Sequence, residues 1–285
     1  MEKIAIITDS AADLSEEYIA ENNIYITNLY VVIDDKYYED RAEINADQLV
    51  EINESGDEHT AKTSAPSPTD FSNVFEKVKE DGYEKAIYIG LNPKLSATFS
   101  NANLAEKHGL DIRMIDSGSV TLVEGIIVIY AVDILKEGLE INEIIKRLES
   151  VIGSQKAYAY FDTLKYLKAG GRLGKVAKHA SSIFNIKPVL SLDGQGDFNL
   201  VKLKATRQKA YDIIGKKVRE DLVKAKKYYL SYISGKDTTV IDDLREKISD
   251  LETKAIAINQ SRFGSVISAH AGSKTFAISY LIIND

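Results

Sequence analysis

The residues best suited to hold a small polar group begin with a hydroxyl-rich segment, Thr-Ser-Ala-Pro-Ser-Pro at residues 63–68. It contains two of the four prolines of the chain, and proline fixes φ at about −65° and favours extended geometry in the preceding residue. Pro66 and Pro68 should therefore hold Thr63 and Ser64 in place. Hydroxyl groups donate and accept hydrogen bonds without charge, which suits recognition of a carboxylate or phosphate more than acid–base chemistry. The alternative is an ordinary helix N-cap, because Ser, Thr and Pro are common at helix starts.

A second group of hydroxyls opens a predicted helix, in the sequence Leu-Ser-Ala-Thr-Phe-Ser at residues 95–100. The first backbone N–H groups of a helix are unpaired, and together with the helix dipole they favour an anion. Ser96 and Thr98 would then face the same bound group as Thr63. The alternative is that Ser96 only caps the helix.

His270 and Arg207 are the candidate imidazole and guanidinium partners of these hydroxyls. His270 ends an apolar run and has small residues on both sides, which makes it the most site-like of the four histidines. Arg207 begins a predicted helix, where its guanidinium could bind a carboxylate through two hydrogen bonds if it turns inward. The alternatives are a structural histidine and a solvated surface charge.

A Gly-Gly corner with basic neighbours follows in the second half of the chain. Lys168, Gly170, Gly171 and Arg172 precede a short stretch with Lys175, Lys178 and His179. Together these residues could form a basic docking patch. A helix C-cap is the simpler explanation of the two glycines.

Several kinds of catalytic or metal site are excluded by the sequence. It has no cysteine, so it has no disulfide, no thiol nucleophile and no thiolate metal ligand. The Gly-x-Ser-x-Gly, P-loop, Gly-x-Gly-x-x-Gly and His-Glu-x-x-His signatures are also missing. An enzyme alternative makes Ser96 a nucleophile activated by His270 in an acyl or phosphate ester hydrolase. The sequence disfavours it, since no acidic residue near His270 is placed to orient the ring. We therefore expect no catalytic residue, no metal and no cofactor.

Elements of two kinds must position these residues. Apolar runs at residues 3–8, 24–33, 85–91 and 110–115 alternate with helical patterns at 14–21, 69–80 and 96–108, and a helical stretch follows through about 119–152. This alternation predicts a parallel sheet covered by helices, a Rossmann-like α/β domain whose ligands sit at the carboxyl ends of the strands. Thr8-Asp9-Ser10, Asn92 to Thr98 and Asp116 to Ser119 fall at those ends.

The second half has an α+β pattern. Strand-like runs are found at residues 157–161, 186–192, 198–203, 228–233, 264–269 and 275–283, with a hairpin turn at 193–197 and helical patterns at 206–225 and 238–251. The sequence therefore predicts two domains, an N-terminal α/β domain at residues 1–152 and a C-terminal α+β domain at residues 153–285.

Composition indicates a soluble globular protein. Hydrophobic residues make up 44% of the 285-residue chain and charged residues 28%, and no apolar run approaches the roughly 20 residues that span a bilayer. The first 25 residues lack the pattern of a secretory signal, so we expect a cytoplasmic location. A net charge of −7 argues against nucleic acid as a partner.

Taken together, these segments resemble the DegV family of bacterial fatty-acid-binding proteins nearly end to end. The matching segments, in chain order, are Thr8-Asp9-Ser10 with Asp13-Leu14, Thr63 to Ser67, Leu95 to Phe99, Asp116-Ser117, Leu164 to Arg172, Ile186-Lys187-Pro188 with Asp193-Gly194, and His270. Each motif is weak alone, but several spaced motifs in one order are strong evidence.

The resemblance implies two α/β domains with an apolar ligand tunnel between them. It implies that Thr63 and Ser96 bind the carboxylate of a long-chain fatty acid, with His270 and Arg207 assisting and with Ser64 and Thr98 in the same ligand-binding group. It also implies a fatty acid kinase as partner, which phosphorylates the presented carboxylate, and it allows transient membrane contact. The protein would then be a lipid-binding subunit and not itself an enzyme.

The chain departs from the family pattern at four positions near the expected site. Ala97 and Ser265 stand where the family usually has glycine and proline, Ser273 interrupts its Gly-Pro-Gly pattern, and Ala205 replaces a basic residue. These changes leave open a different amphiphile or a small anion as the ligand.

Overall fold

The computed structural model describes residues 3–54, 61–174, 176 and 186–283 and contains three β-sheets. Lys175, Lys178 and His179 of the expected basic patch lie outside the described residues. The first sheet, in the order β2-β1-β6-β7, is parallel throughout, with β1 at Ile4–Asp9, β2 at Tyr25–Thr27, β6 at Lys85–Gly90 and β7 at Asp111–Asp116. Every residue of β1 is buried, which explains its continuous apolar sequence, since strands covered on both faces do not alternate.

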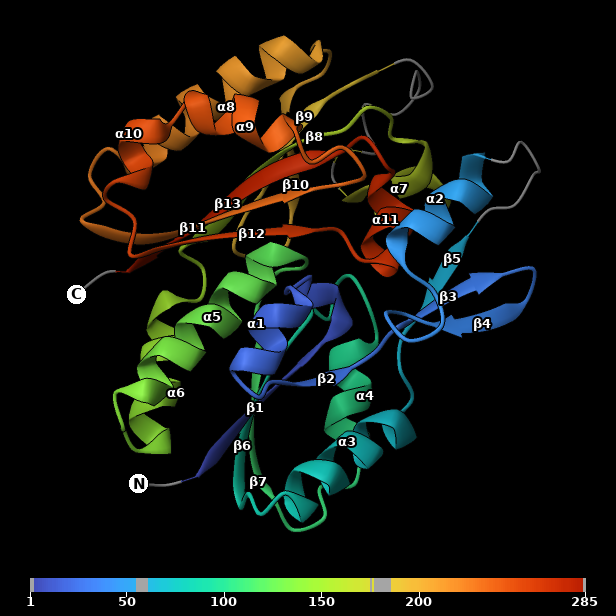
Figure 1. The fold of residues 1–285 in the computed structure, drawn as a ribbon, viewed down its shortest axis with the longest axis vertical. Coiled ribbons are helices and arrows are strands. Elements are labelled where there is room, and N and C mark those ends of the chain that lie inside the picture. The colour runs from blue at the N-terminus through green and yellow to red at the C-terminus, as the bar shows by residue number, and fades with distance from the viewer. Residues whose placement is uncertain (1–2, 55–60, 175, 177–185, 284–285) are drawn as a thin grey trace.

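Helices cover both faces of this sheet (Figure 1). They are α1 at Glu16–Glu21, α3 at Pro68–Glu80, α4 at Thr98–Leu104, α5 at Leu122–Lys136 and α6 at Ile141–Val151, with a 3-10 turn, η1, at Ser10–Ala12. The long helical stretch expected at 119–152 is thus two helices. Gly138, at φ 75°, takes the left-handed conformation at the break between them.

The second sheet has six strands in the order β10-β9-β8-β13-β11-β12 and is mostly antiparallel, with β11 and β12 as its parallel pair. The strands are β8 at Gln155–Tyr160, β9 at Val189–Leu192, β10 at Phe198–Lys202, β11 at Lys227–Ser234, β12 at Ala257–Arg262 and β13 at Phe276–Ile283. The expected hairpin joins β9 to β10. Three helices pack on the outer side of the sheet: α8 at Arg207–Leu222, α9 at Val240–Glu246 and α10 at Ser249–Glu252.

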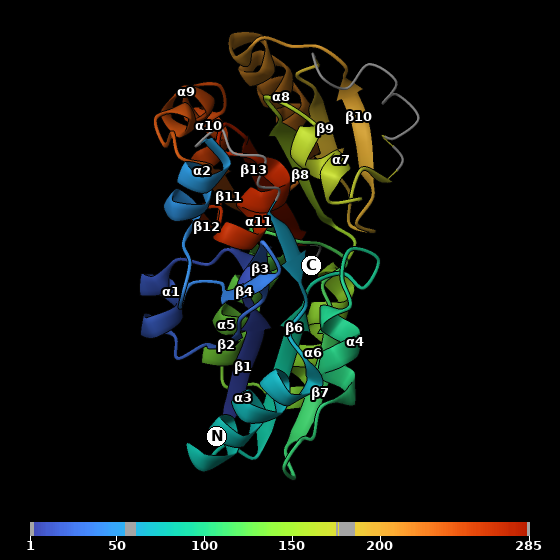
Figure 2. The same cartoon turned by 90° about the vertical axis from the view of Figure 1, so that its right-hand side faces the viewer.

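The two sheets are arranged one above the other along the long axis of the molecule (Figure 2). Helix α5 lies between them, in contact with β1 and β6 of the first sheet and with β11 and β13 of the second. A single apolar cluster therefore runs through the junction, from Ile6 and Ile126 to Ile233 and Leu281. The expected division at residue 152 falls between α6 and β8, where the chain passes from one sheet to the other. The α/β class with a parallel and a mixed sheet is confirmed.

A small third sheet extends the first half of the chain toward the second sheet. It has the order β4-β3-β5, with β3 at Tyr30–Ile33, β4 at Lys36–Glu39 and β5 at Lys62–Ser64. Thr63 and Ser64 thus lie in a strand, not in the loop that the prolines suggested. Pro66 and Ser67 follow, and Ser67 caps α3 in a capping box with Asp70. Helix α2 at Ala46–Glu54 belongs to the same region.

The expected strand at residues 264–269 is wrong. Residues Ser265–Ala271 form helix α11, which packs against α2 and against α7 at Lys165–Ala169. A short apolar run is compatible with a buried strand or a buried helix, and periodicity alone does not separate them. Of the helices that lie within the described residues, none combines the length and apolar character needed to cross a membrane.

Candidate functional site

A cavity lies between the carboxyl ends of β1, β6 and β7 and the inner face of the second sheet. The cavity volume is about 120 Å³, whereas one water molecule needs about 10–15 Å³ on the same measure. The apolar lining residues are Ala11, Leu29, Ala65, Leu91, Leu95, Val120, Val123, Ala157, Ala159, Phe161, Leu167, Leu192, Phe198, Ile233, Phe263, Val266, Ile267, Ala271 and Ala277. Such a cavity fits an extended apolar group.

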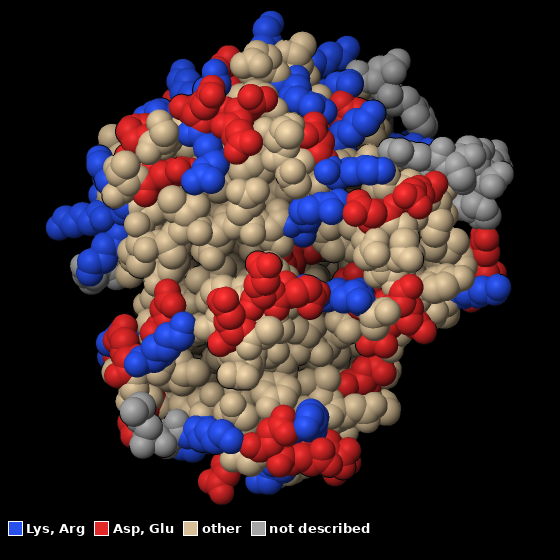
Figure 3. All heavy atoms as spheres, viewed as in Figure 1, with Lys and Arg blue, Asp and Glu red and all other residues tan. Residues whose placement is uncertain are grey.

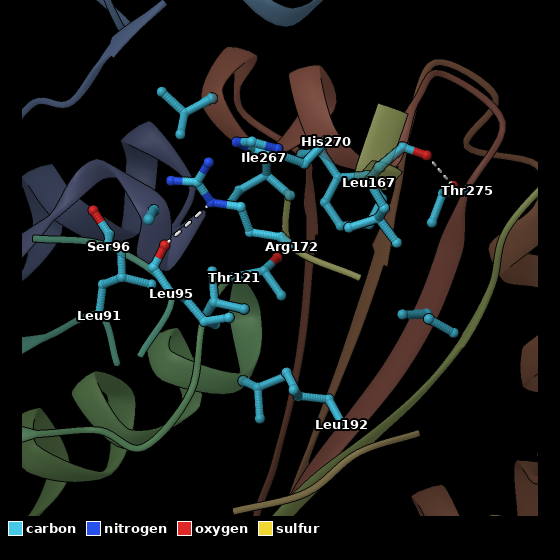
Figure 4. A pocket seen from close by; sticks show the side chains of 18 of the residues that line it. Leu91, Leu95, Ser96, Thr121, Leu167, Arg172, Leu192, Ile267, His270 and Thr275 are labelled. Carbon is cyan, nitrogen blue, oxygen red and sulfur yellow. Dashed lines mark hydrogen bonds between the residues drawn. The ribbon is translucent and has the colours of Figure 1, made fainter. Parts of the chain in front are cut away.

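Most of the polar groups of the cavity gather at one end. Figure 4 shows Ser96, Arg172 and His270 close together, with Leu192 far from them along the cavity. The polar lining residues at this end are Thr63, Ser64, Ser96, Arg172 and His270, and the polar residues Thr121, Thr275 and Ser279 line other parts of the wall. The residues at the polar end come from separate elements: Thr63 and Ser64 from β5, Ser96 from the loop before α4, Arg172 from the turn after α7, and His270 from α11.

Thr63 and His270 meet directly at this polar end. Thr63 Oγ1 lies 2.8 Å from His270 Nε2, although the two residues are 207 positions apart. The Nδ1 atom of His270 is buried and has no hydrogen-bond partner among the described residues. A side chain at residue 170 would overlap the imidazole, so the bare Gly170 lets the ring pack closely. The site thus presents a hydroxyl and an imidazole on one side.

Burial keeps the imidazole of His270 neutral. Burial first, and the nearby Arg172 charge second, lower the pKa of His270 from 6.5 to about 4. A neutral imidazole can donate one hydrogen bond and accept another. It therefore pairs with either a hydroxyl or a carboxylate oxygen.

The pH titration of His270 tests this environment. Because the folded-state pKa is below the unfolded value, the stabilising contribution is fully present above a pH of about 6.5 and is lost as pH falls toward 4. We expect the imidazole NMR signals of His270 in ligand-free protein to titrate with a midpoint near pH 4. His270→Gln assigns the signals by their disappearance. A midpoint near pH 6.5 would show that the ring is exposed.

Arg172 supplies the positive charge at the polar end. Its Nε donates to the Leu95 carbonyl at 3.3 Å, and its Nη1 donates to the Gly170 carbonyl. These bonds link the loop before α4 to the turn after α7. Both acceptors are uncharged carbonyl oxygens, so the bonds do not neutralise the positive charge of the guanidinium. Arg172, and not Arg207, is therefore the guanidinium that lines the cavity.

The structure does not place Arg207 at the cavity. Arg207 starts α8 on the outer side of the second sheet, where Nη1 pairs with Asp237 Oδ2 at 3.0 Å. It lines a separate surface hollow with Asp162, Lys187 and Lys274. The reason is that α8 packs on the face of β8 and β9 opposite to the cavity.

Thr98 is a neighbour of the site rather than part of its lining. It is fully buried, and its Oγ1 lies 2.8 Å from Ser96 Oγ. The Ser96 hydroxyl thus has a fixed partner, and His270 bonds to Thr63 and not to Ser96. This arrangement does not give the Ser96–His270 pair that the hydrolase alternative requires.

Three of the departures from the family pattern are accommodated without strain. Ala97 has φ −74°, a value that any residue adopts. Ala205 is buried, and its N–H donates to the Lys187 carbonyl at 2.9 Å on the side of the sheet away from the cavity. Ser273 lies in the turn before β13, where its carbonyl accepts from Lys236 N at 2.9 Å.

Sequence reasoning missed the polar groups Thr121, Thr275 and Ser279 and did not assign Arg172 to the ligand. Alternation of small residues was the available signal for the floor of the cavity. Ala157 and Ala159 on β8 face Ser279 and Ala277 on β13 in register. All four line the cavity, and small side chains on one face of paired strands leave room above the sheet.

The fold and the cavity define an α/β protein with a parallel sheet, a mixed sheet and a small third sheet, and with an apolar pocket between the two larger sheets that has one polar end. A family model described as uncharacterised protein, DegV family, matches residues 3–282. The chain therefore belongs to the DegV family, as its motifs indicated.

Individual relatives agree with this assignment. A DegV domain-containing protein of Clostridium acetobutylicum is 30% identical over 275 residues, covering 95% of this chain and 96% of the relative. A fatty-acid-binding DegV family protein from Thermus thermophilus superposes with a TM-score of 0.90 at 25% identity, covering 98% of this chain and 99% of that chain. DegV of Bacillus subtilis, described as a fatty acid binding protein, has a TM-score of 0.86 at 26% identity, covering 99% and 100%.

Proposed function

We propose that this protein binds a long-chain fatty acid, with the acyl chain in the apolar cavity and the carboxylate at its polar end. The observation that carries the proposal is the pairing of an apolar cavity with Thr63, Ser96, Arg172 and His270 at one end. A buried carboxylate must be hydrogen-bonded or paired with a charge to offset its desolvation. Hydroxyls, a neutral imidazole and a guanidinium meet that need, and Ser64 completes the group.

Affinity would come mainly from the acyl chain. Burial of each methylene contributes about 0.8 kcal/mol, so a chain of many methylenes needs few polar contacts to bind tightly. The polar end then selects a carboxylate over a neutral head group, because Arg172 and the hydrogen-bond donors are left unpaired otherwise. The fatty-acid-binding relatives of known structure support this reading.

Mass spectrometry of lipid tests the proposal. We expect an organic extract of protein purified without added lipid to contain fatty acid at close to one molecule per chain. After removal of lipid, the protein should take up added long-chain acids and should bind their methyl esters at least about tenfold more weakly, because a lost charged hydrogen bond costs about 1.5–3 kcal/mol. Absence of co-purified acid together with no uptake of added acid would refute the proposal.

We further propose that the bound acid is presented to a fatty acid kinase, which would phosphorylate the carboxylate in the cytoplasm, where ATP is available. A surface hollow lined by Lys94, Gly171 and Gly196 supports this, since it shares Leu95, Arg172 and Phe198 with the cavity. It offers a route from the polar end to the surface beside a basic side chain.

An assay with a fatty acid kinase tests this route. Protein loaded with fatty acid, the kinase and ATP should form acyl phosphate, which is trapped as the hydroxamate. Lys94→Glu should slow the formation of acyl phosphate without loss of bound acid. Equal rates for both proteins would exclude this route.

A further inference from the structure

Helix α11 begins without a cap of its own. Its first residue follows Gly264, which has no side chain to accept from the free N–H groups, and no acidic residue lies in its first turn. The first N–H groups of a helix need partners when they are buried, and Ser265 is fully buried. Helix α11 carries Val266, Ile267 and His270 into the cavity wall. The groups that accept hydrogen bonds from its first N–H groups therefore also fix the position of the imidazole.

Two aspartic acid side chains from the first half of the chain provide the cap. Gly264 N donates to Asp13 Oδ1 at 2.8 Å across 251 positions of sequence. Ser265 N donates to Asp40 Oδ1 at 3.1 Å across 225 positions, and Ser265 Oγ donates to the same oxygen. A Cβ at Gly264 would lie 3.1 Å from Asp13 Oδ1 and 3.4 Å from Asp40 Oδ2. The bare Cα therefore lets both side chains approach the helix start.

These side chains are themselves held in place. Asp13 and Asp40 are 2% and 1% exposed. Asp13 Oδ2 accepts from Thr121 Oγ1 at 2.5 Å, and Thr121 also lines the cavity. Burial raises the pKa of Asp13 to about 8 and also raises the pKa of Asp40. A buried acceptor oxygen that loses its hydrogen-bond donor is left unsatisfied, which is costly, so the bonds of Asp13 and Asp40 to α11 resist displacement.

The cap lies at the inner end of a charged cleft between the two halves of the molecule. Asp13 and Asp40 line this cleft together with Arg41, Asp47 and Arg262, and Figure 3 shows charged side chains of both signs along the crease across this face. Asp47 pairs with Arg262 at 2.5 Å and makes none of the hydrogen bonds that cap α11. It is therefore an acidic neighbour in the same cleft outside the cap.

We propose that Asp13 and Asp40 are positioning residues for the ligand head group: by capping α11 from the first half of the chain, they hold His270 opposite Thr63. The proposal rests on the proposed function, in which His270 contacts the carboxylate. Thr63 is also in the first half of the chain, so the contacts of Asp13, Asp40 and Thr63 all attach α11 to that half. Loss of the cap would let the start of α11 move and would lengthen the contact between Thr63 and His270.

The test measures the imidazole and the head-group preference in the same variants. In Asp40→Ala, we expect the NMR titration midpoint of His270 in lipid-free protein to rise from about 4 toward its ordinary value of 6.5. We expect the preference for a C16 or C18 acid over its methyl ester to fall about tenfold, with ester affinity changed less than threefold. Asp13→Ala should act in the same direction, and Asp40→Asn, which keeps an acceptor oxygen, should restore most of both properties.

Asp47→Ala is the matched control and should leave the titration and the preference unchanged. If an alanine variant does not fold, Ser265→Ala removes the hydroxyl bond to Asp40 alone and should shift the titration in the same direction. An unchanged His270 midpoint and an unchanged acid-to-ester ratio in folded Asp40→Ala and Asp13→Ala, or in Ser265→Ala, would overturn the proposal. The titration needs no lipid, so failure of wild-type protein to bind any fatty acid would refute the proposed function and still leave the positioning role measurable.

Discussion

Replacing Ala277 with phenylalanine is expected to lower the affinity for a long-chain fatty acid by at least roughly 100-fold. Ala277 lies at the centre of the cavity floor, in register with Ala159 on one neighbouring strand and Ile233 on the other. All three line the cavity, so a phenyl ring there would occupy space meant for the acyl chain. Displacement of about four methylenes at about 0.8 kcal/mol each gives about 3 kcal/mol, which corresponds to that loss.

Ile278→Phe is the matched control for Ala277→Phe. Ile278 is the next residue of β13, is fully buried, and packs in the cluster on the other face of the sheet. Extra volume there strains the fold but leaves the cavity open. Binding would be measured by calorimetry on lipid-stripped protein, with thermal unfolding followed in parallel. Equal loss of affinity in both variants would mean that strand disruption, not the cavity, explains the result.

Replacing Thr63 with alanine is expected to weaken fatty acid binding about 10- to 100-fold while the protein stays folded. The change removes a hydroxyl that bonds His270 Nε2 at 2.8 Å and faces the cavity. Hydrogen bonds to charged groups contribute about 1.5–3 kcal/mol, which sets the size of the effect. Thr63 is partly exposed in β5, so its truncation leaves no large buried void.

Thr63→Ser retains the hydroxyl and should bind within about threefold of the wild type. The methyl ester of the same acid separates head-group recognition from the tail, because its affinity should change little in Thr63→Ala. Unchanged affinity of Thr63→Ala for the free acid would remove Thr63 from the head-group site. An equal loss for acid and ester would instead point to a change in the cavity wall.

Much of the fold follows from local patterns in the sequence. The buried strands β1 and β6 are mostly apolar runs, the edge strand β7 mixes apolar and charged residues, and polar residues follow each of the three. Ser67 with Asp70 marks the start of α3. The strand expected at 264–269 failed, because the apolar run there is short and both faces of α11 are covered, by α2 and by α7. Periodicity carries no information where every side of an element is buried.

Part of the site could also be predicted from local sequence patterns. Thr63, Ser64, Ser96 and His270 stand out by residue type and by neighbours, and the structure brings all four to one cavity. Arg207 and Arg172 both begin or follow helices in basic segments, and their sequence contexts do not separate them. The two arginines differ in tertiary position. Helix α8, with Arg207, lies on the face of the second sheet away from the cavity, whereas the turn after α7, with Arg172, lines the cavity.

By itself, the sequence determined the α/β class with a parallel and a mixed sheet, the family, and most of the hydroxyl and imidazole groups that line the cavity. These properties depend on residue type and on spacing within single elements. The tertiary structure alone decided which arginine faces the cavity, that small residues of β8 and β13 form its floor, and that Asp13 and Asp40 cap α11 from more than 200 positions away. Such contacts depend on how distant elements pack, because a side chain can neutralise, cap or make room only for what lies beside it in space.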